Sequence, residues 1–389
     1  MSFHSCSLLK SAELWSACAA AWIAACVPAF AHGFAGDRFF PATITTDDPF
    51  AASELSLPTF SEIRQPGPPP VKVFDISTDL SVLVLPRTAL TIGDGYSIQK
   101  VANQNARTGF DNATLSGLYE FFENDKHEAI TSIGLIWDIG GSGRHSLGND
   151  SFSTFTPTFY FGKGLGDLPD NLPFLRPFAI TGTLGLSIPT RAVNESIAVD
   201  PVTGQKTVSV DHNPNTLQWG LALEYSLIYL KQHVKDIGLK APFDHLIPLV
   251  EFSMSTPLNR GVDELTTGTI NPGVIWSGQY YQVGVEAIIP VNAHTGHNVG
   301  VIAQVHFYLD DLLPKIFSKP LFGRYTDERL YKIVIHCVHA APYPGMLGTC
   351  ICRSRGAGGR KSDSGRTHSG EDLVHRKVRT RLEQDPGVR

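Results

Sequence analysis

The sequence predicts an all-β protein, a transmembrane antiparallel β-barrel of about twelve strands (10 to 14) with long external loops. Residues 216–230 alternate between large apolar and smaller or polar side chains. Similar alternation recurs from Val73 to Leu309, with turn-forming residues between the segments. Only 18% of residues are charged, and beyond the N-terminus no run of about 20 apolar residues could form a transmembrane helix.

The clearest strand signal is residues 216–230. Every odd position is large and mostly apolar: Leu217, Trp219, Leu221, Leu223, Tyr225, Leu227 and Tyr229. A period of two places this set on one face of a strand. Soluble sandwiches also alternate, but a strand of about 15 residues is long for one. A tilted membrane strand needs about 9 to 11 residues in the hydrocarbon and extends beyond it, which explains the length.

Residues 1–31 resemble a secretory signal peptide. Lys10 precedes an apolar stretch, Ala17–Val27, and Ala29-Phe30-Ala31 forms a cleavage site before His32. Two alternatives remain open: a buried N-terminal helix, or a lipoprotein box ending at Cys26 that would leave this cysteine lipidated. The main prediction is export.

The cysteines avoid the body of the chain. Three lie in the predicted signal (Cys6, Cys18, Cys26) and three near the C-terminus (Cys337, Cys350, Cys352). Residues 32–336 therefore cannot contain a disulfide framework or a cysteine-ligated zinc.

After the signal, residues 32–71 are rich in proline and polar clusters without sustained periodicity, so we expect a periplasmic or luminal lead-in. Residues 72–323 are expected to form the barrel. Eleven strand segments are predicted at roughly 73–85, 88–98, 113–122, 127–139, 152–162, 174–188, 216–230, 245–255, 268–276, 279–291 and 299–309. Bacterial single-chain barrels have an even number of strands. We expect twelve, with another strand hidden in residues 39–60; ten is the alternative.

Short and long connections roughly alternate, so residues 189–215 are expected outside the cell and the last strand is expected to end in the periplasm. A hairpin at 195–210 is predicted to extend this loop. Residues 324–389 carry 13 Lys and Arg against 7 Asp and Glu. We interpret them as a basic, disordered tail, appended or frame-shifted.

If the large apolar side chains face the lipid, acidic and polar side chains face the lumen. In one interpretation, they line a water-filled pore that favours cations or polar solutes. In the alternative, Arg176, Arg191 or lead-in residues satisfy them and they only fill a narrow interior. The candidate pore-lining residues are Asp75, Asp79, Glu120, Glu224, Glu251, Glu286, Gln304 and His306.

Four aromatic residues, Trp137, Trp219, Trp276 and Tyr281, are candidates for the aromatic girdles at the membrane interfaces.

The sequence predicts no enzyme, cofactor or metal. Ser253 with His306 could be imagined as a catalytic Ser–His pair, but a chance pairing of such common residues explains them better. The Gly-rich segment Phe161–Gly166 lacks the spacing of a phosphate-binding loop. His336, Cys337, His339, Cys350 and Cys352 fit no common metal-site spacing.

Three segments carry a resemblance to a known family: His32–Pro41, Gly109–Asn112 before a strand, and Ser153–Pro169 with its Phe161-Gly162-Lys163-Gly164 motif. They resemble proteobacterial outer-membrane β-barrel proteins similar to the putative transporters of the MetA pathway of phenol degradation. The resemblance spans roughly residues 32–323. It implies a barrel and passage of small aromatic or hydrophobic compounds, and it supplies no catalytic residues. The basic tail departs from the family pattern.

We therefore expect an outer-membrane channel or transporter for small molecules, with a structural or adhesive surface-display barrel as the alternative. The expected partners are outer-membrane lipid, lipopolysaccharide, the barrel-assembly machinery and an unidentified small solute, but no nucleic acid.

Overall fold

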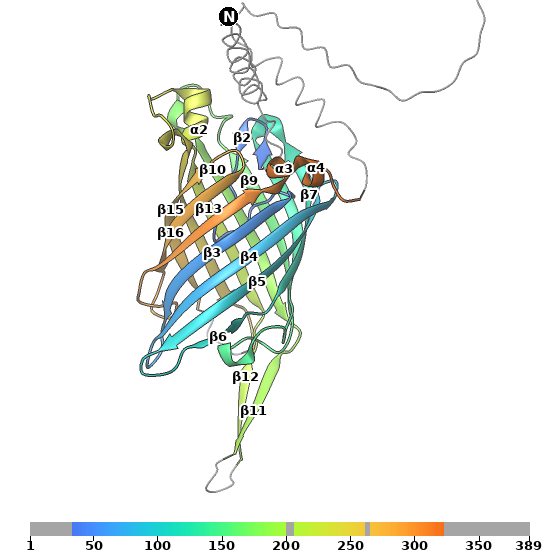
Figure 1. Cartoon of the computed structure of the whole chain (residues 1–389), viewed down its shortest axis with the longest axis vertical. Coiled ribbons are helices and arrows are strands. Elements are labelled where there is room, and N and C mark those ends of the chain that lie inside the picture. The colour runs from blue at the N-terminus through green and yellow to red at the C-terminus, as the bar shows by residue number, and fades with distance from the viewer. Residues whose placement is uncertain (1–32, 200–205, 261–264, 323–389) are drawn as a thin grey trace, which may run out of the picture. The chain divides into compact units, whose positions relative to one another are not determined.

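The computed structural model describes residues 33–199, 206–260 and 265–322, which form a closed barrel of twelve antiparallel strands (Figure 1). The expected fold class and strand number are confirmed. The barrel strands are β3 (Glu54–Gln65), β4 (Val71–Leu85), β5 (Thr88–Val101), β7 (Thr114–Asn124), β8 (Ala129–Asp138), β9 (Thr154–Gly164), β10 (Phe178–Pro189), β13 (Thr216–Tyr225), β14 (Leu246–Pro257), β15 (Thr267–Ser277), β16 (Tyr281–Pro290) and β17 (Gly300–Tyr308).

Each strand pairs with its neighbours in chain order, and β3 pairs with β17 to close the ring. The hidden strand is β3, so the barrel begins at Glu54 and the predicted boundary at residue 72 is wrong. Pro58 follows a cis peptide bond, and the register of β3 shifts between Ser56 and Thr59. This irregularity interrupts the alternation that reveals a strand in the sequence.

The predicted strand at 216–230 is too long. β13 ends at Tyr225, and Ser226 then accepts a hydrogen bond from the backbone N–H of Tyr229, starting the short helix α2 (Leu227–Tyr229) and a π-helical turn, Leu230–Val234. Leu227 and Tyr229 therefore do not continue the outward face of β13. Their alternation with the strand residues is accidental.

The outer face of the barrel is apolar and the interior is polar, the reverse of a soluble protein. Ile92, Ile133 and Leu184 are at least half exposed on the outside. Inside, Ser132, Thr181 and Glu251 are completely buried. An outward band of exposed aliphatic and aromatic side chains is the pattern of a barrel surrounded by lipid. In the described part of the chain, no helix is long and apolar enough to cross a membrane.

The two ends of the barrel differ. At the end we call the helix end lie α2 and the short helices α3 (Leu309–Leu312) and α4 (Pro314–Phe317) (Figure 1). At the opposite end, the hairpin end, β11 (Val193–Val199) and β12 (Lys206–His212) pair and project beyond the barrel. A projecting hairpin was predicted at 195–210. Its expected turn, Pro201–Gly204, lies outside the described residues, as do the predicted signal peptide and the basic tail.

One part of the wall is paired over only part of its length. β5 pairs with β7 only from Thr88 to Gly93, and nearer the hairpin end it pairs instead with β6 (Arg107–Phe110). The loop between β8 and β9 lies against β6, where the backbone N–H of Arg144 donates a hydrogen bond to the carbonyl of Phe110.

Candidate functional site: a lumen filled by the N-terminal segment

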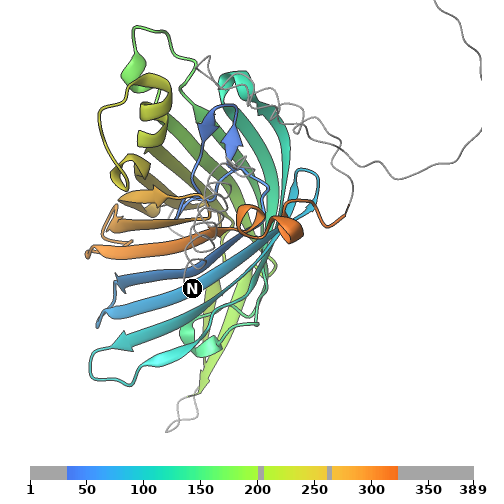
Figure 2. The ribbon, with the colours of Figure 1, turned by 45° about the horizontal axis from the view of Figure 1, so that its top comes forward.

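Residues 33–53 lie inside the barrel, and we call them the plug (Figure 2). The plug begins with a small hairpin, β1 (Phe34–Ala35) with β2 (Arg38–Phe39), near the helix end. It then runs without regular structure to β3. Phe40 is 1% exposed and packs with Ala35 of the plug and with Ala179 of the wall strand β10. The predicted lead-in is therefore luminal rather than periplasmic over these residues.

Glu251 of β14 makes the densest polar contact with the plug. Its completely buried carboxylate accepts hydrogen bonds from three successive backbone N–H groups, those of Ile44 (2.8 Å), Thr45 (3.0 Å) and Thr46 (2.6 Å). These groups belong to a loop and have no helix or sheet partner of their own. A carboxylate that receives several N–H donors makes short, charge-assisted bonds. Glu251 therefore fixes the centre of the plug.

The next two strands of the wall, β15 and β16, extend this contact. Glu286 of β16 accepts a hydrogen bond from the Thr45 hydroxyl (3.0 Å). The Thr45 hydroxyl oxygen in turn accepts a hydrogen bond from the side-chain amide of Asn271 of β15 (2.7 Å). Gly273 makes room for Glu286, since a Cβ there would lie 2.4 Å from the Glu286 Cγ. Gln282 donates its amide to the carbonyl of Ala42. Three adjacent strands thus bind one face of the plug.

The other end of the plug is held by β7 and β8. Glu120, 2% exposed, accepts a hydrogen bond from the backbone N–H of Ala51 (2.8 Å). Ser132 donates its hydroxyl to the carbonyl of Pro49. Arg87, at the turn between β4 and β5, lies 3.7 Å from the Glu120 carboxylate. The polar side chains on opposite walls of the lumen therefore converge on the plug backbone.

At the helix end, Arg38 locks the plug to three connections between strands. Its completely buried guanidinium donates to the Glu128 carboxylate (3.1 Å), to the carbonyl of Pro177 (3.0 Å) and to that of Arg176. It also lies over the ring of Tyr229, 3.6 Å from the ring centre. Buried ion pairs need such additional partners to offset the loss of hydration.

Three of the candidate pore-lining carboxylates, those of Glu120, Glu251 and Glu286, thus accept hydrogen bonds from the plug. Glu120, Glu224, Glu251 and Glu286 are each no more than 2% exposed. Glu224 accepts a hydrogen bond from the hydroxyl of Thr181 (3.2 Å). For Glu120, Glu251 and Glu286, these contacts favour the interpretation in which lead-in residues satisfy the carboxylates. Arg176 and Arg191 do not serve this role, because they donate to Leu168, Asp170 and Ser151.

The remaining candidates lie along β4 and β17. The Asp75 carboxylate accepts from the Ser61 hydroxyl at 3.4 Å, Asp79 is exposed, and Gln304 donates to the Thr59 hydroxyl (3.1 Å). His306 contacts Ser56 through Nδ1 (2.9 Å), and its Nε2 lies 3.3 Å from Glu54. The serine in contact with His306 is therefore Ser56, and the sequence argument against a Ser253–His306 pair is unaffected. Ser56 does not line either of the two cavities described next.

A cavity of about 360 Å³ lies beside the plug, and we call it the vestibule. Hydroxyl and amide side chains of five strands line it, and the plug contributes its boundary. Lining residues include Thr46, Asp47, Thr183, Gln218, Ser253 and Thr269. Three residues of the plug, Thr45, Thr46 and Asp47, thus line the vestibule on the side of the filled part of the lumen.

Asp47 opens onto the vestibule, but enclosure by the barrel and the negative charges of Asp79 and Glu251 raise its pKa to about 6. A carboxyl whose pKa is higher in the docked plug than in water binds a proton on docking. Docking of the plug is therefore disfavoured when Asp47 is ionised. This cost is absent below pH 3.8, the ordinary pKa of Asp, and is fully present above about pH 6, so lowering the pH favours the docked plug. We therefore expect conductance across a bilayer to fall as the pH is lowered from about 7 to 4.

Asp47→Asn should flatten this pH profile, whereas Asp170→Asn, which changes a carboxylate exposed at the helix end, should leave it intact. A profile that Asp47→Asn does not alter would assign the pH dependence to other groups.

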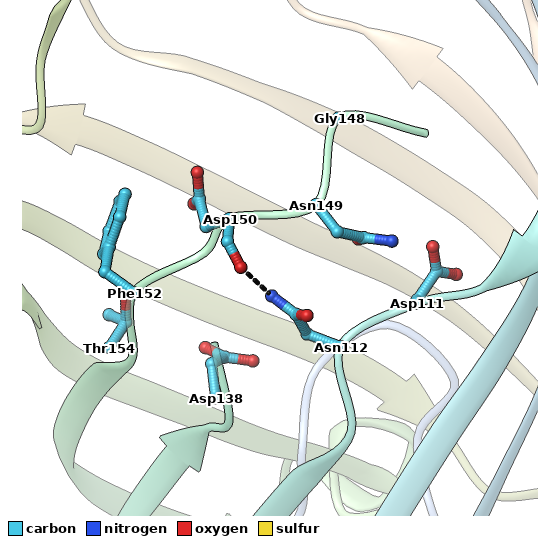
Figure 3. Close-up of a pocket in the computed structure, with 8 residues that line it drawn as sticks. All are labelled: Asp111, Asn112, Asp138, Gly148, Asn149, Asp150, Phe152 and Thr154. Carbon is cyan, nitrogen blue, oxygen red and sulfur yellow. Dashed lines mark hydrogen bonds between the residues drawn. The ribbon is translucent and has the colours of Figure 1, made fainter. Parts of the chain in front are cut away.

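A second cavity, of about 350 Å³, lies between the β6–β7 connection, the end of β8 and the β8–β9 loop (Figure 3). Its polar lining comprises Asp111, Asn112, Asp138, Asn149 and Asp150, and the Asn112 amide donates to the carbonyl of Asp150 (2.9 Å). Burial raises the pKa of Asp150, and burial together with Asp75 raises that of Asp111. Within the described residues no group of three or more His, Cys, Asp or Glu is arranged to hold a metal ion. The predicted His–Cys cluster of the tail lies outside them.

The four predicted interfacial aromatics lie near the two ends of the barrel. Trp276 and Tyr281 flank the tight turn between β15 and β16 at the helix end, with ring centres 5.5 Å apart. Trp137 lies near the hairpin end of β8 and stacks on Phe155 (5.8 Å), and Trp219 lies near the hairpin end of β13. Their spacing along the strands suits two girdles.

Sequence reasoning missed Arg38 and Asn271. The alternation placed Gln282 on the inward face of β16 but did not identify its partner in the plug, and Asn271 occupies an inward position on β15. Arg38 lies in the lead-in, where no pattern distinguishes it.

No protein-family model matches the chain, and no curated protein matches it. Among solved structures, it is similar to an outer membrane channel from Pseudomonas putida F1, with 10% identity, a TM-score of 0.45, and coverage of 69% of this chain and 99% of that chain. It is also similar to the NanC porin, with 6% identity, a TM-score of 0.36, and coverage of 66% and 98%. The NalP autotransporter translocator domain of Neisseria meningitidis shares 8% identity, with a TM-score of 0.38 and coverage of 67% and 90%. At these identities the likeness concerns the fold.

Proposed function

We propose that this protein is a bacterial outer-membrane channel for small molecules that is closed by its own N-terminal plug. One observation carries the proposal: the plug crosses the lumen beside a polar cavity and is held by wall side chains on several strands. Side chains alone can fill a barrel of about eight strands, whereas a barrel of twelve strands is wider and its lumen holds more than side chains. A removable polar plug is suited to a conduit that opens.

The proposal includes the placement in the cell. Residues 1–31 direct export, the helix end lies in the periplasm with both ends of the barrel chain, and the β11–β12 hairpin lies outside the cell. The hydroxyl lining of the vestibule favours a solute that makes hydrogen bonds. The resemblance to the MetA family of phenol degradation implies aromatic or hydrophobic cargo, and a small hydroxylated aromatic compound satisfies both requirements.

A reversible tether between plug and wall tests this function. A Cβ at Gly220 would lie 2.6 Å from the Thr46 Cγ2, so cysteines at both positions are within disulfide reach. Residues 32–336 contain no cysteine, and the tail cysteines can be replaced by serine. We expect Thr46→Cys/Gly220→Cys protein to be electrically silent in planar bilayers when oxidised and to open after reduction. Each single-cysteine variant is the matched control and should not respond to the redox state.

Equal conductance of the oxidised and reduced proteins would show that ions bypass the plug, which contradicts the proposed gate. The runner-up function, a structural or adhesive surface-display barrel, is favoured by the filled lumen and the projecting hairpin. A folded protein that stays silent even after the plug is weakened would favour it.

A further inference from the structure

Three basic side chains form a row on the outside of the barrel. Arg64 of β3 is directly opposite Lys72 of β4, and Lys72 is directly opposite Lys100 of β5. All three are exposed and, by strand alternation, share the outward face with Phe60 and Phe74. Adjacent strands are about 4.8 Å apart, so the row extends about 10 Å around the barrel.

The row is short of negative charge. Like charges directly opposite each other destabilise a sheet pair. Only Glu62 compensates, through an ion pair with Lys72 (2.7 Å) in which both side chains are 48% exposed. The structure records no ion pair for Arg64 or Lys100 with any described residue. A bound anion would relieve the repulsion along the row.

The row also lies at a defined height. It is at the hairpin end of β3, β4 and β5, next to the β3–β4 turn. Toward the helix end, the same face becomes apolar: Phe60 stacks on Phe74 (6.1 Å), and Tyr96 packs against Phe110, which is 59% exposed. Basic side chains directly above an apolar band match a lipid whose acyl chains lie against the band and whose headgroup is anionic.

We propose that Arg64, Lys72 and Lys100 bind the phosphate groups of lipopolysaccharide in the outer leaflet. The inference rests on the outer-membrane placement proposed above. Phosphates attached to the sugars immediately above the acyl chains reach this height, and the guanidinium of Arg64 can bind one through two parallel N–H bonds. Lys72 and Lys100 contribute point charges beside it.

The test uses the full-length protein in detergent micelles, titrated with fluorescent lipopolysaccharide. Replacing Arg64, Lys72 and Lys100 together with Gln should weaken binding at least about tenfold. A matched variant with Lys235, Lys240 and Lys315 changed to Gln removes the same charge at the helix end and should bind as the wild type does. Removing the phosphates from the lipid should weaken binding to the wild-type protein by at least as much as removing the three basic side chains weakens binding of intact lipopolysaccharide.

Wild-type affinity in the row variant, or equal affinity for dephosphorylated lipopolysaccharide, would overturn the proposal. So would equal competition by phosphatidylglycerol, which would indicate a general attraction for anionic lipid. Heat-modifiable gel mobility confirms that each variant is folded. Conductance measured in bilayers without lipopolysaccharide separates the two proposals: a silent barrel that binds the lipid contradicts only the channel, and a conducting barrel indifferent to the phosphates contradicts only the lipid site.

Discussion

Replacing Glu251 with alanine should open the channel more strongly than any other single change in the lumen. The substitution removes the acceptor of three plug N–H groups at once, and each bond to a charged group contributes about 1.5 to 3 kcal/mol. Because bonds to one carboxylate are not additive, we expect a loss of about 4 kcal/mol in plug docking, a factor of about 1,000 in the equilibrium. The N–H groups are solvated once the plug leaves, so the released state bears no equivalent cost.

Single-channel recordings of the full-length protein measure this effect as open probability. Glu251→Gln keeps one carbonyl acceptor without the charge and should give an intermediate value. Glu62→Ala removes a carboxylate from the outer face and is the matched control. Trypsin provides a second readout, since Arg38 is completely buried and becomes a cleavage site only when the plug leaves. A Glu251→Ala protein that is folded, silent and resistant at Arg38 would be incompatible with the plug as the gate.

The wall of the barrel could be predicted from sequence because it obeys a local rule. Alternation with a period of two is set by adjacent residues and survives wherever the strand is regular, as in β10 and β16. It fails where the backbone departs from that rule. At Pro58 the register shift hides β3, and after Tyr225 the Ser226 cap starts a helix although the apolar alternation continues.

The closed state of the lumen could not be predicted in the same way. Alternation identified Glu251 and Glu286 as inward, but not what they contact, because Glu251 is 205 residues from its partner Thr46. The plug itself has no periodicity, since it is an extended loop whose N–H groups are satisfied by side chains of the wall. The conformation of the plug is therefore determined by tertiary contacts. Through the same contacts, Glu120, Glu251 and Glu286 bind the plug.

Replacing Arg38 with methionine should release the plug at the helix end. Methionine retains much of the volume and removes the charge. Among the described residues, Tyr229 and Gly166 then remain as donors to the Glu128 carboxylate, which is 5% exposed. Breaking one side of a buried ion pair costs about 3 to 5 kcal/mol. Arg38→Lys keeps the charge but cannot reach Glu128 and two carbonyls with one planar fork, so it should recover only part of the loss.

Maleimide labelling measures this release in a background without other cysteines. Ala35→Cys places the thiol in the core beside Phe40 and Ala179, where the native side chain is completely buried. We expect Arg38→Met to accelerate its labelling about 1,000-fold, which corresponds to about 4 kcal/mol, within the range of 3 to 5 kcal/mol. Arg191→Met, at the hairpin end, should leave the rate unchanged. If the double variant Arg38→Met/Glu128→Gln loses no more plug-docking free energy than either single variant, the ion pair accounts for the effect of both residues. If the two losses add, Arg38 instead holds the plug through the carbonyls of Arg176 and Pro177 and the ring of Tyr229.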